Sequence, residues 1–61
     1  MTVEELMKHI DGCFKIWITE KDRKTTVCQC NDKWDIPEEI EKEIVNNWIC
    51  CEKRVKVCLD R

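Results

Sequence analysis

The chain has 61 residues, of which 43% are hydrophobic and 39% charged, and its formal net charge at pH 7 is -2. This length supports one domain with one thin core, and the composition is that of a folded chain rather than a disordered one. The small net charge argues against nucleic-acid binding driven by overall positive charge. No apolar stretch approaches the roughly 20 residues of a membrane span. We therefore expect a single domain over residues 1–61, with neither nucleic acid nor membrane among its partners.

The N-terminal segment predicts a helix over residues 2–10. Thr2 and Glu5 have the spacing of a capping box, in which each side chain bonds the other residue's backbone amide. Apolar residues then recur at the spacing of one buried helix face, namely Val3, Leu6, Met7 and Ile10. The segment has acids where a signal peptide would have bases, so we expect a cytoplasmic protein with reduced cysteines.

Residues 13–19 alternate in polarity and predict a strand with one buried face. The residues expected to face the core are Phe14, Ile16 and Ile18. Those expected to face outward are Cys13, Lys15, Trp17 and Thr19. A charged turn follows, and the β-branched start of residues 25–30 predicts a second strand that completes a hairpin.

The middle of the chain predicts a short helix over about residues 37–43. Asp35 can cap its first turn with a side-chain carboxylate, and Pro37 suits the first helical position. Residues 44–50 then favour a strand, because Ile, Val and Trp prefer extended structure. The alternative is one long helix over residues 37–51.

A last strand is predicted over residues 54–60. Its inward residues are Val55, Val57 and Leu59, and its outward residues are Lys56, Cys58 and Asp60. Together the elements predict an α+β fold, in which the N-terminal helix packs on a four-stranded antiparallel sheet. That sheet consists of two hairpins joined by a short helix (αββαββ). With the long second helix, the alternative is αββαβ.

The sheet face opposite the helices is the predicted binding surface. One long and one short helix can cover only one face of a four-stranded sheet. Exposed aromatic surface marks sites of binding or self-association. The candidate interface consists of Trp17, Trp48, Lys15, Cys50, Lys56 and Cys58. Alternatively, the aliphatic stems of Lys15 and Lys56 cover part of this face.

The six cysteines form no recognisable catalytic motif. Cys28 and Cys30 are expected on one side of a strand, which is a weaker zinc signal than a C-x₂₋₄-C turn. The alternative function is a zinc-binding module that uses Cys28, Cys30, Cys50 and Cys58. His9 is the only histidine and lies off the apolar face, so no thiol–base pair is evident. We expect no enzymatic activity, no cofactor and no small-molecule substrate.

A third alternative is a nucleic-acid binder. It would use basic residues from two turns of the chain, namely Lys21, Arg23, Lys24, Lys53, Arg54 and Lys56. The net charge of -2 makes nucleic-acid binding less favoured than either the protein-binding surface or the zinc-binding module.

Three short motifs carry a resemblance to a known group of proteins. They are Thr2-Val3-Glu4-Glu5-Leu6, Ile10-Asp11-Gly12 and Asn31-Asp32-Lys33-Trp34-Asp35-Ile36-Pro37-Glu38-Glu39. With these motifs the chain resembles small uncharacterised proteins found in phages and prophages of Firmicutes, especially clostridia. The resemblance implies a bacterial cytoplasmic setting and supplies no activity or catalytic residue.

The resulting functional prediction is a non-enzymatic protein of phage type that acts through protein–protein contact. We expect it to self-associate as a homo-oligomer, to bind a host protein, or both. The sharper variant of this hypothesis is an inhibitor of a host enzyme or of an antiphage defence system.

Overall fold

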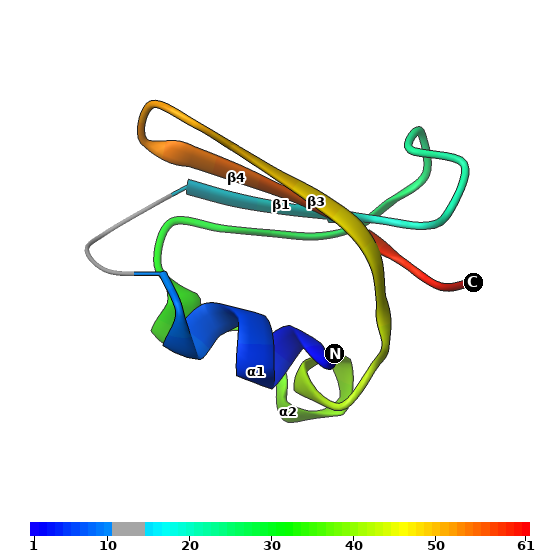
Figure 1. Cartoon of the computed structure of the whole chain (residues 1–61), viewed down its shortest axis with the longest axis horizontal. Helices are drawn as coiled ribbons and strands as arrows, with labels where there is room; N and C mark the ends of the chain where they lie inside the picture. Colours follow the sequence, from blue (N-terminus) through cyan, green and yellow to red (C-terminus); the bar gives the residue numbers. More distant parts are fainter. Residues whose placement is uncertain (11–14) are drawn as a thin grey trace.

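The computed structural model describes residues 1–10 and 15–61, and these form two layers. The elements are α1 (Val3–Lys8), β1 (Lys15–Thr19), β2 (Thr26–Cys30), the 3-10 helix η1 (Lys33–Asp35), α2 (Glu38–Glu41), β3 (Val45–Cys51) and β4 (Arg54–Leu59). The helices lie on one side of a four-stranded sheet (Figure 1). The predicted α+β fold is therefore confirmed. Of the helices in this part of the chain, none has the length and hydropathy needed to cross a bilayer.

Helix α1 begins as its sequence predicts. The Thr2 hydroxyl accepts a hydrogen bond from the Glu5 amide (3.2 Å), and the Thr2 amide donates to the Glu5 carboxylate (3.1 Å). This capping box satisfies two of the amides that a helix start leaves free. At the other end, the Lys33 ammonium donates to the carbonyls of Met7 (3.4 Å) and Ile10 (3.0 Å). A lysine distant in sequence thus binds the negative end of the α1 dipole.

The strand order is β2-β1-β4-β3. Both predicted hairpins are antiparallel, but β1 and β4 run parallel at the centre. The sheet is therefore mixed, and the expectation of a wholly antiparallel sheet is wrong in this respect. The cause is the connection through η1 and α2, which passes the helix side and returns the chain to the end where β2 began (Figure 1). As a result β3 runs in the same direction as β2, and β4 in the same direction as β1.

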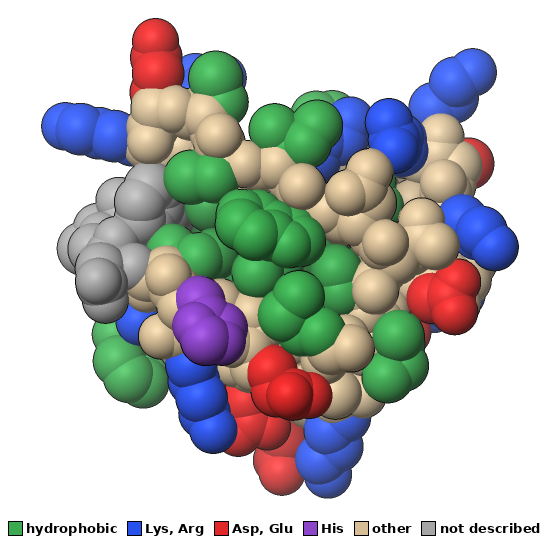
Figure 2. All heavy atoms as spheres, viewed as in Figure 1, with side chains coloured by type: hydrophobic (Ala, Val, Ile, Leu, Met, Phe, Trp, Pro, Cys, Tyr) green, Lys and Arg blue, Asp and Glu red, His purple; other side chains and the backbone are tan. Residues whose placement is uncertain are grey.

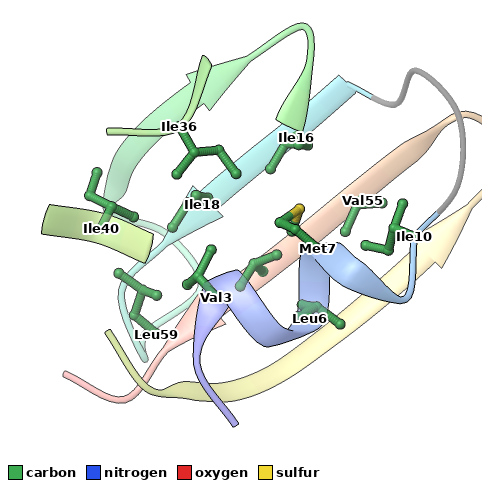
Figure 3. Close-up of a cluster of buried hydrophobic side chains, with 11 residues drawn as sticks. Val3, Leu6, Met7, Ile10, Ile16, Ile18, Ile36, Ile40, Val55 and Leu59 are labelled. Atoms are coloured by element: carbon green, nitrogen blue, oxygen red, sulfur yellow. The ribbon is translucent and has the colours of Figure 1, made fainter. Parts of the chain in front are cut away.

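The core lies between α1 and the two central strands (Figure 3). It consists of Val3, Leu6, Met7, Ile10, Ile16, Ile18, Ile36, Ile40, Val55, Val57 and Leu59. The predicted inward faces of β1 and β4 are confirmed for the residues that the structure describes, whereas Cys13 and Phe14 lie outside them. Each fully buried Val, Leu or Ile stabilises the fold by about 1.5–3 kcal/mol relative to exposure.

The junction between the hairpins differs from its prediction. Asp35 belongs to η1, whose cap is Asp32, and α2 follows Pro37 without any side-chain cap. The expectation that Asp35 caps the second helix is therefore wrong. The predicted strand over residues 44–50 is confirmed by β3, and the alternative of one long helix over residues 37–51 is wrong. Poor helix formers such as Asn, Val and Trp instead gain a hydrogen-bonded ladder with β4.

Candidate functional site

A bulge in β3 determines which way its side chains point. The β3–β4 register pairs Val45 with Leu59 and then Asn47 with Cys58, so β3 has one extra residue at Asn46. Beyond this point Trp48 lies opposite Val57, which is fully buried in the core. Directly opposite residues of an antiparallel pair share a face. Trp48 therefore lies on the helix side of the sheet, because one extra residue reverses the alternation.

The predicted interface is consequently divided between two faces. Lys15, Trp17 and Lys56 come together on the outer face, the side opposite the helices, as expected. Trp48 and Cys50 lie on the helix side, so the expectation that they share a face with Trp17 is wrong.

Cys58 points to the outer face as predicted, but it is only 4% exposed. Its Sγ lies 3.6 Å from the Thr19 hydroxyl, which also donates to the Glu20 carbonyl (3.0 Å). Thr19, predicted to face outward, is likewise fully buried. Neither side chain is available to a partner, so the usable outer surface lies toward the opposite end of β1 and β4.

The outer face is organised around Trp17. Its indole N–H donates to the Thr26 hydroxyl (2.9 Å), and the Lys56 ammonium lies 4.6 Å from the centre of its ring. Along the sheet, Trp17 has Gln29 as its partner on β2 and Lys56 as its partner on β4. These contacts hold the indole in place while 38% of the residue stays exposed. A fixed, partly exposed aromatic ring is a typical anchor for a binding partner.

A depression of about 960 Å³ hollows this part of the outer face. It is lined by Lys15, Ile16, Trp17, Gln29, Cys30, Asn31, Ile49, Cys51, Glu52, Arg54, Val55 and Lys56. Arg54 was predicted only in the basic cluster of the nucleic-acid alternative, and Ile49 was not predicted as a site residue. The orientation of Ile49 depends on the bulge, which the periodicity of the sequence does not reveal. We call the surface formed by Lys15, Trp17, Lys53, Arg54 and Lys56 the basic hollow.

The free edge of the sheet is a second candidate surface. Strand β3 is an edge strand, and Val45–Cys51 contains no charged side chain. Its beginning is covered by the N-terminus, because the Val45 amide donates to the Met1 carbonyl (2.8 Å). Residues 46–51 lie beyond that cover. We call this segment the β3 edge.

Large apolar side chains stand on both faces of the β3 edge. Trp48 is 40% exposed on the helix side, and Ile49 is 56% exposed on the outer side. Hydrophobic side chains gather on the face where β3 passes α1 (Figure 2). The Trp48 amide donates to the Asn47 side chain (2.8 Å), so it is satisfied within β3 itself. This edge combines exposed apolar surface with backbone groups that can pair with another strand.

The thiols do not assemble the predicted zinc site. Cys28 and Cys30 lie on β2 with their sulfurs 3.3 Å apart, whereas Cys50 lies on β3 at the opposite edge. Four-stranded spacing separates these edges by roughly 14 Å, far beyond the reach of one ion. Cys58 is buried on the other face. Among the described residues no three Cys, His, Asp or Glu side chains form a group that could hold a metal.

Burial raises the pKa of the Cys30 thiol to about 12, and the neighbouring Cys28 adds to this increase. A thiol with so high a pKa remains protonated at neutral pH and is a poor nucleophile. The pair therefore behaves as part of the apolar packing at the β2 side of the core.

Comparisons with known proteins add no relative to this description. No protein-family model, no curated protein and no solved structure matches the chain.

Proposed function

We propose that this is a non-enzymatic protein that acts through protein–protein contact, and that two copies associate through the β3 edge. The observation that carries the proposal is the uncharged edge strand with Trp48 and Ile49 exposed on its two faces. Natural edge strands usually avoid self-pairing by means of charge, proline, a β-bulge or a covering segment. Residues 46–51 have neither charge nor proline. The bulge lies at the start of this segment, at Asn46, and the N-terminus covers only the residues before it.

Antiparallel pairing about a two-fold axis is the arrangement that suits this edge. A two-fold contact uses the same surface on both copies, so each β3 would pair with its own equivalent. The two four-stranded sheets would then become one continuous sheet. No like charges meet at the axis, because β3 contributes only neutral side chains. The sequence Val45-Asn46-Asn47-Trp48 thus favours a partner strand of the same composition.

Side-chain burial adds to the backbone pairing. Trp48 would pack beside the partner's α1 face, and Ile49 would contact the partner's β3 on the outer side. Aromatic side chains at the centre of an interface commonly contribute most of its binding energy. The opposite edge, β2, has no exposed large hydrophobic residue in the described part of the chain, and this favours β3 as the contact.

The phage setting remains a prediction that rests on the resemblance alone. Within it, the β3 edge offers two roles. The protein is a homodimer, or it adds its edge strand to an open sheet of a host enzyme or defence protein. Self-association is the role that the uncharged edge supports directly.

The test is a measurement of molar mass by light scattering during gel filtration, in reducing buffer and over a range of protein concentrations. We expect a dimer that dissociates on dilution. Ile49→Lys places a charge in the proposed contact and should give a monomer, while its circular dichroism stays unchanged. Trp34→Ala is the matched control, because Trp34 is 82% exposed on η1 and lies outside the β3 edge. A wild-type chain that is monomeric at millimolar concentration, or a control that dissociates equally, would exclude the proposal.

A further inference from the structure

We propose that the basic hollow is a second docking site and that it binds an acidic segment of a partner protein. It occupies the outer face of the sheet, and it shares Ile49 and Cys51 with the β3 edge. Three features of this surface support the proposal: its unbalanced positive charge, a repulsive pair of residues, and the fixed position of Trp17.

Cations dominate this end of the outer face. Lys15, Arg54 and Lys56 line the depression together with Glu52, and Lys53 lines a smaller depression that shares Lys15 and Arg54 with it. In residues 1–10 and 15–61 the ion pairs are Lys21–Asp60, Lys42–Glu38 and Arg61–Glu43. None of the four cations of the hollow is therefore neutralised by a carboxylate of the described chain. Positive charge that is left unbalanced around a depression attracts anionic partners.

The remaining charge of the molecule is distributed in the opposite way. Residues 1–10 and 31–43, which include both α-helices, hold eight acids and three lysines. Charge is therefore distributed unevenly over the molecule. One end of the sheet is cationic, and the helix side is anionic. Net charge alone conceals this division, since the whole chain sums to -2.

Lys15 and Arg54 form the repulsive pair. They lie directly beside each other in the parallel β1–β4 register. Like charges at neighbouring positions on one face of a sheet destabilise it. A carboxylate placed between the two would remove this repulsion, and the Arg54 guanidinium can bind a carboxylate through two parallel hydrogen bonds. Relief of this repulsion would therefore add to the binding free energy.

Polypeptide fits the hollow better than nucleic acid does. The Trp17 ring already has the Lys56 ammonium 4.6 Å from its centre, and its N–H is bonded to Thr26, so it is not an open platform for base stacking. The acids on the helix side would repel a long polyanion. On the β3 side the lining becomes apolar, with Ile49 and Cys51. An acidic segment with interspersed apolar side chains matches both halves of the surface.

The probe is an octapeptide of alternating Glu and Leu, titrated into ¹⁵N-labelled protein and followed by NMR. We expect saturable shifts at the amides of Lys15, Arg54 and Lys56 and at the Trp17 indole, and an affinity that falls as salt is raised. The variant Lys15→Glu with Arg54→Glu should weaken binding by about tenfold or more. The matched control Lys21→Glu with Lys24→Glu makes the same charge change in the β1–β2 turn, and it should bind the peptide within about twofold of wild type.

Several outcomes would overturn the proposal. They are the absence of saturable shifts, equal binding of a Lys–Leu octapeptide, tighter binding of a twelve-residue oligothymidylate, and equal loss in the control variant. If the same shifts appear when the protein concentration is raised without peptide, the hollow binds the acidic helix side of a second copy and not a partner protein. The light-scattering test of the β3 edge is run without peptide, so failure of either idea is seen separately.

Discussion

Trp48 lies directly opposite Val57 in the β3–β4 ladder, and Val57 is fully buried against the helices. This pairing places the indole on the helix side, at the free edge of the sheet. Trp17, by contrast, lies beside Lys56 on the outer face. The two tryptophans therefore mark two different surfaces, one apolar and neutral and the other cationic.

The position of Trp48 predicts a contribution to the fold itself. It is 40% exposed, so more than half of a large side chain is removed from water at the core margin. We expect Trp48→Ala to lower the free energy of unfolding by about 1–3 kcal/mol, measured by urea denaturation at a protein concentration where the chain is monomeric. Trp34→Ala, at 82% exposure, should change it by less than about 0.5 kcal/mol. Equal effects of the two substitutions would contradict the placement of Trp48.

How far the sequence predicts this arrangement depends on the scale of the feature. The alternation of β4 is strict, and Val55, Val57 and Leu59 are buried as expected. The capping box of α1 is also local, since both of its partners lie within one turn. Such features are visible in sequence because their cause lies within a few residues.

The bulge at Asn46 is not visible in this way. Asn46 and Asn47 are both polar, so the pattern of β3 fits either phase, and only pairing with β4 selects one. The parallel contact of β1 with β4 is likewise a property of strand order, which periodicity does not encode. The candidate surfaces depend on both the bulge and the strand order. The individual strands could therefore be predicted from the sequence, but the residues that share each surface could not.

The hydrogen bonds of Lys33 join η1 to the end of α1, and we expect them to contribute measurably to stability. Its ammonium donates to the carbonyls of Met7 and Ile10. Lys33→Met keeps the aliphatic stem and removes these bonds, so we expect a loss of about 1 kcal/mol in urea denaturation. Lys42→Met is the control, because Lys42 makes only a 3.8 Å surface pair with Glu38 and should contribute less than about 0.5 kcal/mol. A loss in the control as large as in Lys33→Met would assign the effect to charge alone.

We expect the Asp22 carboxylate to stabilise the fold in a way that is lost at low pH. Hydrogen bonds from the backbone amides of Thr25 and Lys24, and from the Thr25 hydroxyl, lower the pKa of its carboxyl group from 3.8 to about 2. The folded state thus holds this proton less tightly than the unfolded state does. The stabilisation is present above pH 3.8 and is lost as the pH falls toward about 2.

Asp22→Asn tests this assignment by thermal denaturation between pH 5 and roughly pH 2, the window set by the two pKa values. We expect the variant to be less stable than wild type at pH 5 and to lose less stability on acidification. Asp60→Asn is a suitable control, because Asp60 is paired with Lys21 at 3.7 Å on the exposed surface. Parallel stability curves for wild type and Asp22→Asn would show that the turn does not depend on the ionised carboxylate.

The thiols of β2 and β3 predict different reactivity toward an alkylating agent. The high pKa of Cys30, about 12, arises first from burial and then from Cys28, whose sulfur is 3.3 Å away. Cys50 and Cys51 are exposed on the β3 edge. Since the thiolate is the reactive form, iodoacetamide at pH 8 should label Cys50 and Cys51 many times faster than Cys30, as followed by peptide mass spectrometry. Cys28→Ser removes one contribution to the raised pKa and should speed labelling of Cys30, while burial keeps it slower than Cys50. Labelling of Cys30 at the rate of Cys50 in the folded wild type would contradict the packed position of β2 against the core.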